Sequence, residues 1–177
     1  MKLENKIAVV TGGAMGNGQG IVEVFAKYGA RIIIFDNNDK IASSISEYRN
    51  KGFDVAGYKV DIRDARKVKL CVEDIMKRYG KIDILVNNAG VAKLEKFVDM
   101  SDEVRDFHFD VNIKGTWNVT KAIVPYMQKE KSGKIVNLSS VTGPMVADTG
   151  EVAYATTKAA LIGFTKGLAM ELVNDNI

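Results

Sequence analysis

Short apolar runs alternate along this chain with longer segments in which apolar residues recur at helical spacing. The runs are rich in branched residues and predict strands at residues 6–10, 31–35, 53–60, 82–86 and 134–138. The segments that predict helices are residues 20–28, 41–49, 65–79, 102–127 and 154–173. Strands that are almost continuously apolar and separated by helices indicate a parallel sheet covered on both faces. The pattern predicts one α/β domain over residues 1–177, a doubly wound parallel sheet in three layers (α/β/α).

Polar residues and glycines follow the carboxyl ends of the predicted strands. They are Gly12–Gly18, Asp36, Asp61, Asn87–Gly90 and the pair Ser139-Ser140. Open parallel sheets bind ligands at this edge. We therefore expect these residues to form one ligand site, although they are spread over most of the chain.

The first of these stretches is a glycine-rich turn between a strand and a helix. Gly12, Gly16 and Gly18 let backbone N–H groups and the positive end of a helix dipole approach a pyrophosphate without Cβ atoms in the way. Met15 and Asn17 stand between these glycines and belong to the same candidate site. Strand, turn and helix in this order predict dinucleotide binding on a Rossmann-type fold.

An acidic residue ends the second predicted strand. Asp36 lies about twenty residues beyond the glycines, where a carboxylate accepts hydrogen bonds from adenosine ribose hydroxyls and repels a 2′-phosphate. Asn37 and Asn38 come next, so no Arg or Lys directly follows the acid. This favours NAD over NADP as the cofactor, with Asn37 among the cofactor-binding residues.

Tyr154 and Lys158 lie four residues apart in a predicted helix, and Ser140 lies upstream at the end of an apolar run. Positions i and i+4 share one helix face, so the ammonium can lie near the phenol and favour its ionised form. Such a phenol can move a proton on and off an alcohol oxygen. The spacing alone also fits a half-buried tyrosine beside a solvated lysine. The glycine turn at the other end of the chain favours the chemical interpretation.

Composition excludes several other classes. The chain has 177 residues, 46% hydrophobic and 27% charged, with a net charge of +3. Basic and acidic residues are interleaved, which argues against nucleic-acid binding, and no stretch approaches the length that spans a membrane. We expect a cytoplasmic protein because no apolar targeting segment precedes the first strand. Cys71, the only cysteine, is interpreted as a packing residue, and no metal site is expected.

Together these motifs resemble the short-chain dehydrogenase/reductase family. The resemblance spans the whole chain and rests on the glycine turn, Asp61-Ile62, Asn87-Asn88-Ala89-Gly90, Asn112 in Val-Asn-Ile-Lys-Gly, Ser140, and Tyr154-x-x-x-Lys158. The glycine spacing is similar to that of the short-form members. Within the family, the segments 107–110, 117–121 and 139–143 resemble the UcpA-type oxidoreductases.

The resemblance implies an NAD(P)-dependent oxidoreductase that transfers a hydride between nicotinamide and a small alcohol or carbonyl substrate. Tyr154 would be the general acid or base, Lys158 would hold the nicotinamide ribose, and both would contact the cofactor. Ser140 would hydrogen-bond the substrate oxygen. Asn112 would kink the long helix and hold a water that links Lys158 to solvent.

Further cofactor contacts are implied by the same resemblance. Asp61 and Ile62 would contact adenine, and Asn88, Ala89 and Gly90 would line the cofactor cleft.

The resemblance also bears on the substrate and on assembly. The loop 141–152 would add an apolar wall to the substrate pocket. Members of the family commonly pair their two long helices with those of a neighbour. We therefore expect a homodimer or homotetramer.

Some of these residues have a simpler interpretation. Ser139 could replace Ser140 as the catalytic serine. Asp61 could cap a helix, although Asp64 is better placed to do so. Asn87 could tie neighbouring strand ends together.

His108 is the only histidine and suggests a Ser-His-Asp triad with Ser140 and Asp110. No nucleophile-elbow sequence surrounds Ser140, which argues against that triad. We interpret His108 as a residue of the long helix near an interface or the rim of the site. Trp117 and the methionines are interpreted as packing residues.

The chain departs from the family in two respects. Asn17 stands where an aliphatic residue is usual, which should weaken packing but leave the backbone N–H for phosphate binding. Family members usually continue for several tens of residues, with further strands and a substrate loop, beyond the position of Ile177. We expect a protein of these residues alone to be inactive or nearly so. The rival to the enzyme is a non-catalytic nucleotide-binding protein or an inactive truncated form.

Overall fold

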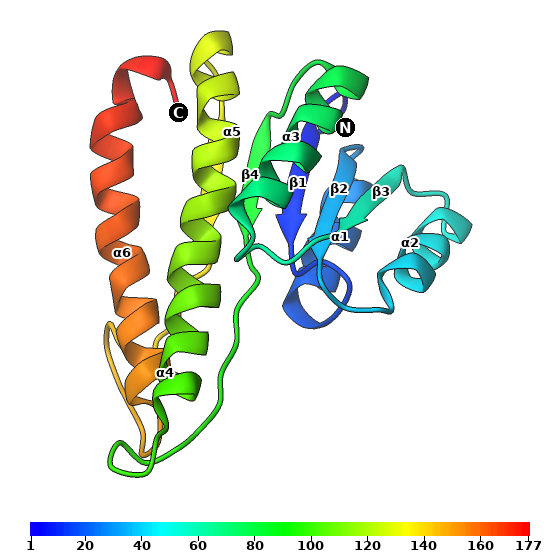
Figure 1. Ribbon diagram of the computed structural model, residues 1–177. Helices are drawn as coiled ribbons and strands as arrows, with labels where there is room; N and C mark the ends of the chain where they lie inside the picture. The colour runs from blue at the N-terminus through cyan, green and yellow to red at the C-terminus, as the bar shows by residue number, and fades with distance from the viewer.

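The computed structural model describes residues 1–177 and is built on a parallel sheet (Figure 1). In chain order the strands are β1 (Ile7–Thr11), β2 (Arg31–Asp36), β3 (Val55–Lys59), β4 (Ile84–Asn87) and β5 (Lys134–Asn137). Within the sheet they follow the order β3-β2-β1-β4-β5, and every neighbouring pair is parallel. The strand order reverses between β1 and β4, which is where such sheets bind ligands. The predicted doubly wound sheet is confirmed.

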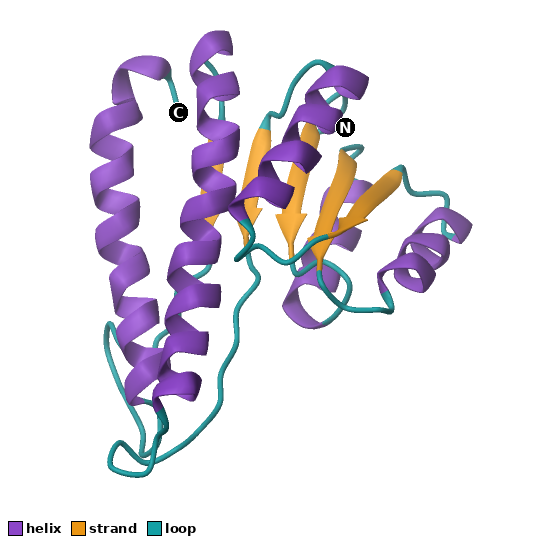
Figure 2. Cartoon of the chain, viewed as in Figure 1, coloured by secondary structure: helices purple, strands orange, loops and turns teal.

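Helices cover both faces of this sheet (Figure 2). They are α1 (Gly16–Lys27), α2 (Ile41–Asn50), α3 (Ala65–Tyr79), α4 (Asp102–Phe109), α5 (Thr116–Glu130) and α6 (Val152–Leu172), with a π-helical segment at Asp110–Gly115 and a 3-10 turn at Val173–Asp175. Helices α1 and α2 pack on one face, and α3 and α5 pack on the other. Helix α6 runs beside α5 (Figure 1). The three predicted layers are therefore present.

Alternate residues of the central strands enter two separate apolar cores, because successive side chains of a strand point to opposite faces. Val9 of β1 packs in one core with Val72 of α3 and Ile123 of α5. Its neighbour Val10 packs in the other core with Val22 of α1. Burial of each such side chain contributes about 1.5–3 kcal/mol. Packing in these two cores fixes the central strands, and the carboxyl ends of these strands carry the candidate site.

Helix α1 begins earlier than the apolar pattern indicates. Its first residue is Gly16, whereas the pattern places the start at residue 20. Gly16, Gly18 and Gly20 carry no side chains, so the first turn of the helix leaves no apolar periodicity in the sequence.

The long helix predicted over residues 102–127 is continuous but not uniform. Helix α4 passes into the π-helical segment Asp110–Gly115, which passes into α5. The Thr116 hydroxyl donates to the Asn112 carbonyl at 3.0 Å within this stretch. The irregularity includes Asn112, where the family resemblance implies a kink.

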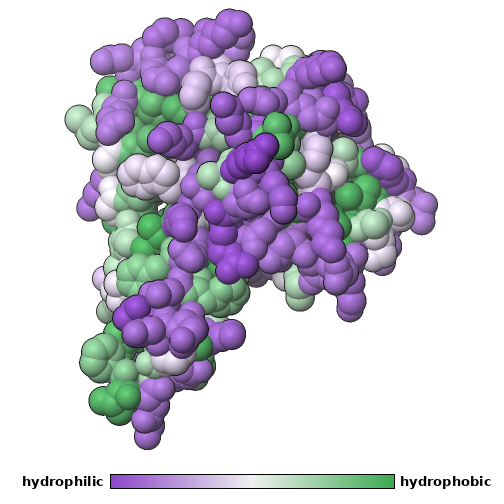
Figure 3. All heavy atoms as spheres, viewed as in Figure 1, coloured by the Kyte–Doolittle hydropathy of each residue, from purple (hydrophilic) through white to green (hydrophobic).

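Two loops extend beyond the carboxyl ends of β4 and β5 and form the lower tip of the molecule (Figure 1). They cover residues 88–101 and 138–151, and the Glu95 N–H joins them by donating to the Gly150 carbonyl at 3.1 Å. Exposed apolar side chains gather on these loops, and Figure 3 shows hydrophobic surface at the tip. They are Leu94, Phe97, Val98, Val141, Met145 and Val146.

A groove of about 380 Å³ runs between α5 and α6. Trp117 lines it and is 53% exposed, with its ring centroid 5.3 Å from that of Phe164. Trp117 thus packs on Phe164 of α6, as its interpretation as a packing residue expects, while about half of its surface stays exposed. No helix in the structure combines the length and apolarity needed to cross a membrane.

Candidate active site

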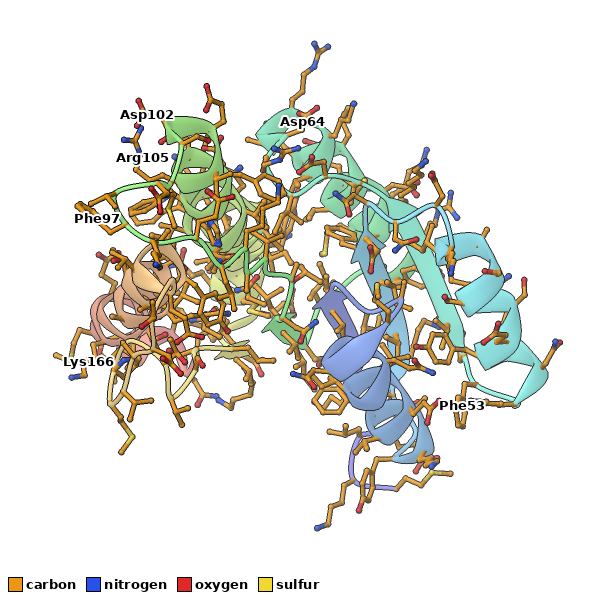
Figure 4. All side chains as sticks on the ribbon, turned by 90° about the horizontal axis from the view of Figure 1, so that it is seen from below. Phe53, Asp64, Phe97, Asp102, Arg105 and Lys166 are labelled. Carbon is orange, nitrogen blue, oxygen red and sulfur yellow. The ribbon has the colours of Figure 1, made fainter.

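A cleft of about 410 Å³ opens at the carboxyl ends of the strands, the edge from which Figure 4 views the molecule. Its volume lies in the range of small-molecule sites. Most of its lining was predicted from the sequence: Gly12, Met15, Asn17, Asp36, Asn37, Asp61, Ile62, Asn88, Ala89 and Gly90. Further lining comes from Phe35, Asn38, Val60, Val91, Phe107 and Val111. The fold thus brings together residues that are far apart in the sequence.

The glycine turn needs its glycines for two different reasons. Gly12 and Gly16 have φ values of 65° and 59°, a conformation that side chains disfavour. Gly18 is required by close packing, since a Cβ there would lie 2.0 Å from the Gly12 carbonyl oxygen and 2.6 Å from Asn88 Nδ2. Gly16 and Gly18 do not line the cleft themselves. Gly18 lets the amino end of α1 pack closely behind the residues that do, and Gly16 provides the backbone conformation that leads into the helix.

Hydrogen bonds join this turn to the loop after β4. The Thr11 hydroxyl accepts the N–H groups of Asn88 and Ala89 at 3.0 and 2.9 Å. The Asn88 amide donates to the carbonyls of Thr11 and Gly12 at 2.9 and 3.1 Å. Asn88 therefore fixes two walls of the cleft against each other. Thr11 shares this work and was missed among the site residues, although its place directly before Gly12 could have indicated it.

Asp36 is buried at the end of β2 and is held by backbone N–H groups. One carboxylate oxygen accepts from Ala14 at 3.0 Å, and the other accepts from Asn38 at 2.9 Å. Each oxygen keeps a lone pair for a further donor, as a carboxylate offers about four acceptor sites. Asp36 thus presents fixed negative charge to the cleft.

Asp61 lies on the same cleft and is paired with Arg63. The guanidinium Nη2 donates to the Asp61 carboxylate at 2.6 Å, and the Arg63 backbone N–H donates at 2.9 Å. The guanidinium hydrogen bond lowers the pKa of Asp61 below its ordinary value. Asp64 caps α3 instead, because its side chain accepts the Lys67 N–H at 3.0 Å. The alternative role of Asp61 as the helix cap is therefore wrong.

Asn112 is completely buried in the π-helical segment and uses its whole amide. Its Oδ1 accepts the Val91 N–H at 2.8 Å, while Nδ2 donates to the Val91 carbonyl at 3.0 Å. The same Nδ2 donates to the Thr157 hydroxyl at 2.9 Å. Asn112 thus connects the cleft wall at Val91 to α6.

Lys158 is 5% exposed and lies between α6 and the end of β5. Its Nζ donates to the Leu138 carbonyl at 2.7 Å and lies 5.7 Å from the Tyr154 ring centroid. Burial lowers the pKa of Lys158, since desolvation disfavours the ammonium. A Cβ built on Gly90 would lie 3.5 Å from this Nζ. Lys158 therefore adjoins the end of the cleft formed by Gly90.

The two serines at the end of β5 make different contacts. The Ser139 hydroxyl donates to the Lys158 carbonyl at 2.7 Å and so ties the loop to α6. The Ser140 hydroxyl accepts the Thr142 N–H at 3.1 Å. Ser140, Tyr154 and Lys158 do not line the 410 Å³ cleft. The structure thus places most of the predicted cofactor residues in one cleft, and it places Ser140, Tyr154 and Lys158 outside its lining.

Asn87 is a structural residue, as the simpler interpretation expects. Its Nδ2 donates to Asn137 Oδ1 at 2.8 Å and to the Thr120 hydroxyl at 2.9 Å. These contacts tie β4 to β5 and to α5. The Asn87 Oδ1 is buried without a hydrogen-bond partner.

His108 is completely buried in α4, where its ring contacts the loop that continues from the cleft wall at Val91. Both of its ring nitrogens bond backbone atoms, of Lys93 and Val104, and neither bonds Ser140 or Asp110. The rejected triad has no geometric support. Phe107, its neighbour, lines the cleft, and sequence reasoning missed it because a single aromatic on a helix usually indicates core packing.

Residues 6–177 match the model of the short chain dehydrogenase family. This match extends over almost the whole chain, and the chain belongs to that family. The family uses a nicotinamide cofactor, and the cleft and glycine turn described above are consistent with that chemistry.

Within the family the sequence is of the UcpA type. It is 51% identical to oxidoreductase UcpA of Salmonella typhimurium over 99% of this chain and 67% of that protein. The identity is 40% to the 3-oxoacyl-[acyl-carrier-protein] reductase FabG of Thermotoga maritima, over 100% of this chain and 72% of that protein. A gluconate 5-dehydrogenase from Burkholderia cenocepacia, solved with NADP and tartrate, has a TM-score of 0.94 at 30% identity. That alignment covers 99% of this chain and 69% of that structure.

Proposed function

We propose that the protein transfers a hydride between a nicotinamide cofactor and an alcohol or carbonyl substrate, with Tyr154 as general acid or base. The observation that carries this proposal is the position of Lys158, whose buried Nζ lies near both the Tyr154 ring and the Gly90 end of the cleft. A buried cation acts more strongly on a neighbouring phenol than a solvated one, because the local dielectric is low.

Each group has a distinct part in this proposal. The cofactor supplies hydride chemistry, and the protein orients it and moves the proton. Tyr154 exchanges a proton with the substrate oxygen, and Ser140 donates a hydrogen bond to that oxygen. Lys158 holds the ribose next to nicotinamide and lies beside the Tyr154 ring. Asn112 fixes Val91 against α6 and so keeps the cleft and the catalytic side chains in register.

The cleft supports NAD as the preferred cofactor. Asp36 presents a carboxylate that is fixed by two N–H groups, and no lysine or arginine lines the cleft to bind a 2′-phosphate. The related gluconate 5-dehydrogenase was solved with NADP, so both cofactors belong in the assay.

The lower tip supports an apolar wall for the substrate. Val141, Met145 and Val146 are exposed in the loop that starts at Ser140 and ends at the first turn of α6. Relatives suggest one carbonyl class and one alcohol class to assay, because one is named as a 3-oxoacyl reductase and another as a gluconate dehydrogenase.

Replacing Tyr154 by Phe tests the proposal. The chemical step should slow by about 10²–10⁴-fold, because proton transfer is lost while the ring is kept. NADH binding should stay within about twofold, since Tyr154 does not line the cleft. Turnover is followed by NADH absorbance with a 3-oxoacyl thioester and in reverse with gluconate. Tyr126→Phe, on α5, is the matched control and should leave both quantities unchanged.

The outcomes separate the enzyme from its rival. Cofactor binding without turnover in the unmodified protein supports a nucleotide-binding protein that does not catalyse. Equal turnover in the unmodified protein and Tyr154→Phe would contradict the proposed role of the tyrosine.

We also propose that α5 and α6 pair with those of a second copy. Helix α6 exposes Ile162 and Met170 together with Gly163 and Gly167, and exposed apolar surface of this kind often marks a protein–protein contact. Gly163 and Gly167 line the groove beside Trp117, with nothing within 4 Å of an added Cβ. Gly167→Arg should halve the mass measured by sedimentation equilibrium, whereas the exposed neighbour Lys166→Arg should not. An unchanged mass for Gly167→Arg would exclude this face as the interface.

A further inference from the structure

His108 is the only histidine of the chain, and its side chain is completely buried. Its Nδ1 lies 2.8 Å from the Val104 carbonyl oxygen, and its Nε2 accepts the Lys93 backbone N–H at 2.9 Å. A carbonyl can only accept and an amide N–H can only donate. The proton must therefore be on Nδ1, and Nε2 must be bare. The two backbone contacts select one neutral tautomer of the ring.

His108 acts together with Asn112, one helical turn further on. Residues four apart on a helix share one face. Asn112 holds both backbone groups of Val91, and His108 holds the backbone N–H of Lys93. One face of the α4 helix and its π-helical extension thus grips alternate residues of the loop after β4.

The gripped segment, Gly90–Lys93, is a wall of the candidate site. Gly90 and Val91 line the cleft, and Gly90 also adjoins Lys158 Nζ. The Lys93 Nζ lies 5.3 Å from the ring centroid of Phe107, another lining residue. Movement of Lys93 away from α4 would therefore displace one wall of the cleft.

We propose that His108, in its Nδ1–H form, is a positioning residue that holds Gly90–Lys93 in place as a wall of the cofactor cleft. It touches neither cofactor nor substrate, and it acts through the Lys93 N–H. The inference rests on the proposed function only in that the ligand of the cleft is taken to be a nicotinamide cofactor.

The tautomer is measured in the unmodified protein. Long-range ¹H–¹⁵N correlation spectra of the ring should show a protonated Nδ1 and a bare Nε2 at neutral pH. The Lys93 amide should exchange slowly with solvent. A protonated Nε2 in the neutral ring, or a Lys93 amide that exchanges as fast as a free peptide, would overturn the proposal without any mutation.

Two substitutions test the contacts of Nδ1 and Nε2 separately. His108→Asn keeps a donor near the Nδ1 position for Val104 but has no acceptor that reaches Lys93. His108→Gln places an acceptor near the Nε2 position and can restore the Lys93 contact. We expect Lys93 amide exchange to accelerate at least about tenfold in His108→Asn, since a buried donor loses its partner. Val91 exchange should accelerate with it, and His108→Gln should stay close to the unmodified protein in both rates.

If Gly90–Lys93 shapes the cleft, cofactor affinity should also be affected more by His108→Asn than by His108→Gln. The NADH dissociation constant should rise about tenfold in His108→Asn and less than about threefold in His108→Gln. Equal effects of the two variants on exchange or affinity would show that only ring volume matters and would overturn the proposal. The proposal would also be overturned if His108→Asn accelerated exchange of the Lys93 amide alone and left the Val91 exchange rate and the NADH dissociation constant unchanged.

The amide exchange rates also distinguish a failure of the proposed enzymatic function from a failure of the proposed role of His108. If the unmodified protein binds no NADH, the proposed function fails, and the exchange rates of Val91 and Lys93 still decide whether His108 positions the segment.

Discussion

The two halves of the candidate site are built in different ways. Around β1 and β2 the walls are mostly backbone, with Gly18 packed on the Gly12 carbonyl and Asp36 held by two N–H groups. Around β4, β5 and α6, polar side chains form hydrogen bonds to the loops that follow the strands. Asn112 bonds Val91 and Thr157, and Lys158 bonds the Leu138 carbonyl. The first half depends on the absence of side chains, and the second depends on their hydrogen bonds.

This difference teaches which kind of change each half tolerates. Added volume should damage the glycine turn, whereas changes of charge or hydrogen bonding should damage the half that contains α6. Asp36 belongs to the backbone-built half but should still be sensitive to a change of charge, because its carboxylate is fixed by two backbone N–H groups.

The largest effect is expected at the glycine turn. Gly18→Ala should lower the free energy of unfolding by about 3 kcal/mol and abolish measurable NADH binding, because its Cβ meets a backbone carbonyl that cannot move aside. Urea denaturation measures the stability. Gly20→Ala is the control, since nothing lies within 4 Å of its Cβ, and it should gain about 0.5–1 kcal/mol. Equal stability of the two variants would refute the steric account.

A smaller effect is expected from removing the charge of Asp36. Asp36→Asn keeps the size of the side chain but loses the anion that attracts ribose hydroxyls and repels a 2′-phosphate. The ratio of NADH affinity to NADPH affinity should fall about tenfold, which corresponds to a hydrogen bond to a charged group. Fluorescence titrations with both cofactors measure the ratio. Asp39→Asn is the control, because that exposed carboxylate pairs with Lys59 and does not line the cleft.

The smallest effect is a pH dependence caused by Lys158. Burial lowers its pKa in the folded state, so the unfolded chain holds more protons between that lowered value and about 10.4. Stability relative to Lys158→Met should therefore rise with pH through this window, by at most about 1.4 kcal/mol per pH unit. Denaturation midpoints of both proteins across the alkaline range provide the difference. A difference that falls with pH would mean that the folded protein favours the ammonium.

Much of the fold could be predicted from local pattern alone. The bounds of α3 agree with the predicted helix at 65–79, because its apolar residues recur regularly and Asp64 and Gly80 mark its ends. The cofactor cleft could be predicted as well, since parallel strands bring their carboxyl ends together whatever their separation in sequence.

The residues that sequence reasoning missed act through contacts between distant segments. Thr11 bonds a loop 77 residues away, and nothing in its own neighbourhood shows that partner. The sequence shows that His108 lies on a helix, but it does not show that the side chain is buried there. Once buried, both of its ring nitrogens bond backbone atoms. Local periodicity does not encode which backbone N–H will face a ring nitrogen, because that depends on how α4 packs against the loop.

The π-helical segment has a consequence for helical phase. Each residue of an α-helix turns the chain by about 100°, and a π turn contains about one residue more than an α turn. The single surplus residue at Asp110–Gly115 rotates the α4 half relative to the α5 half. Phe107 can therefore face the cleft while Val119 and Ile123 face the sheet. Deleting one residue here would bring the two halves back into phase and turn one of these faces away from its partner.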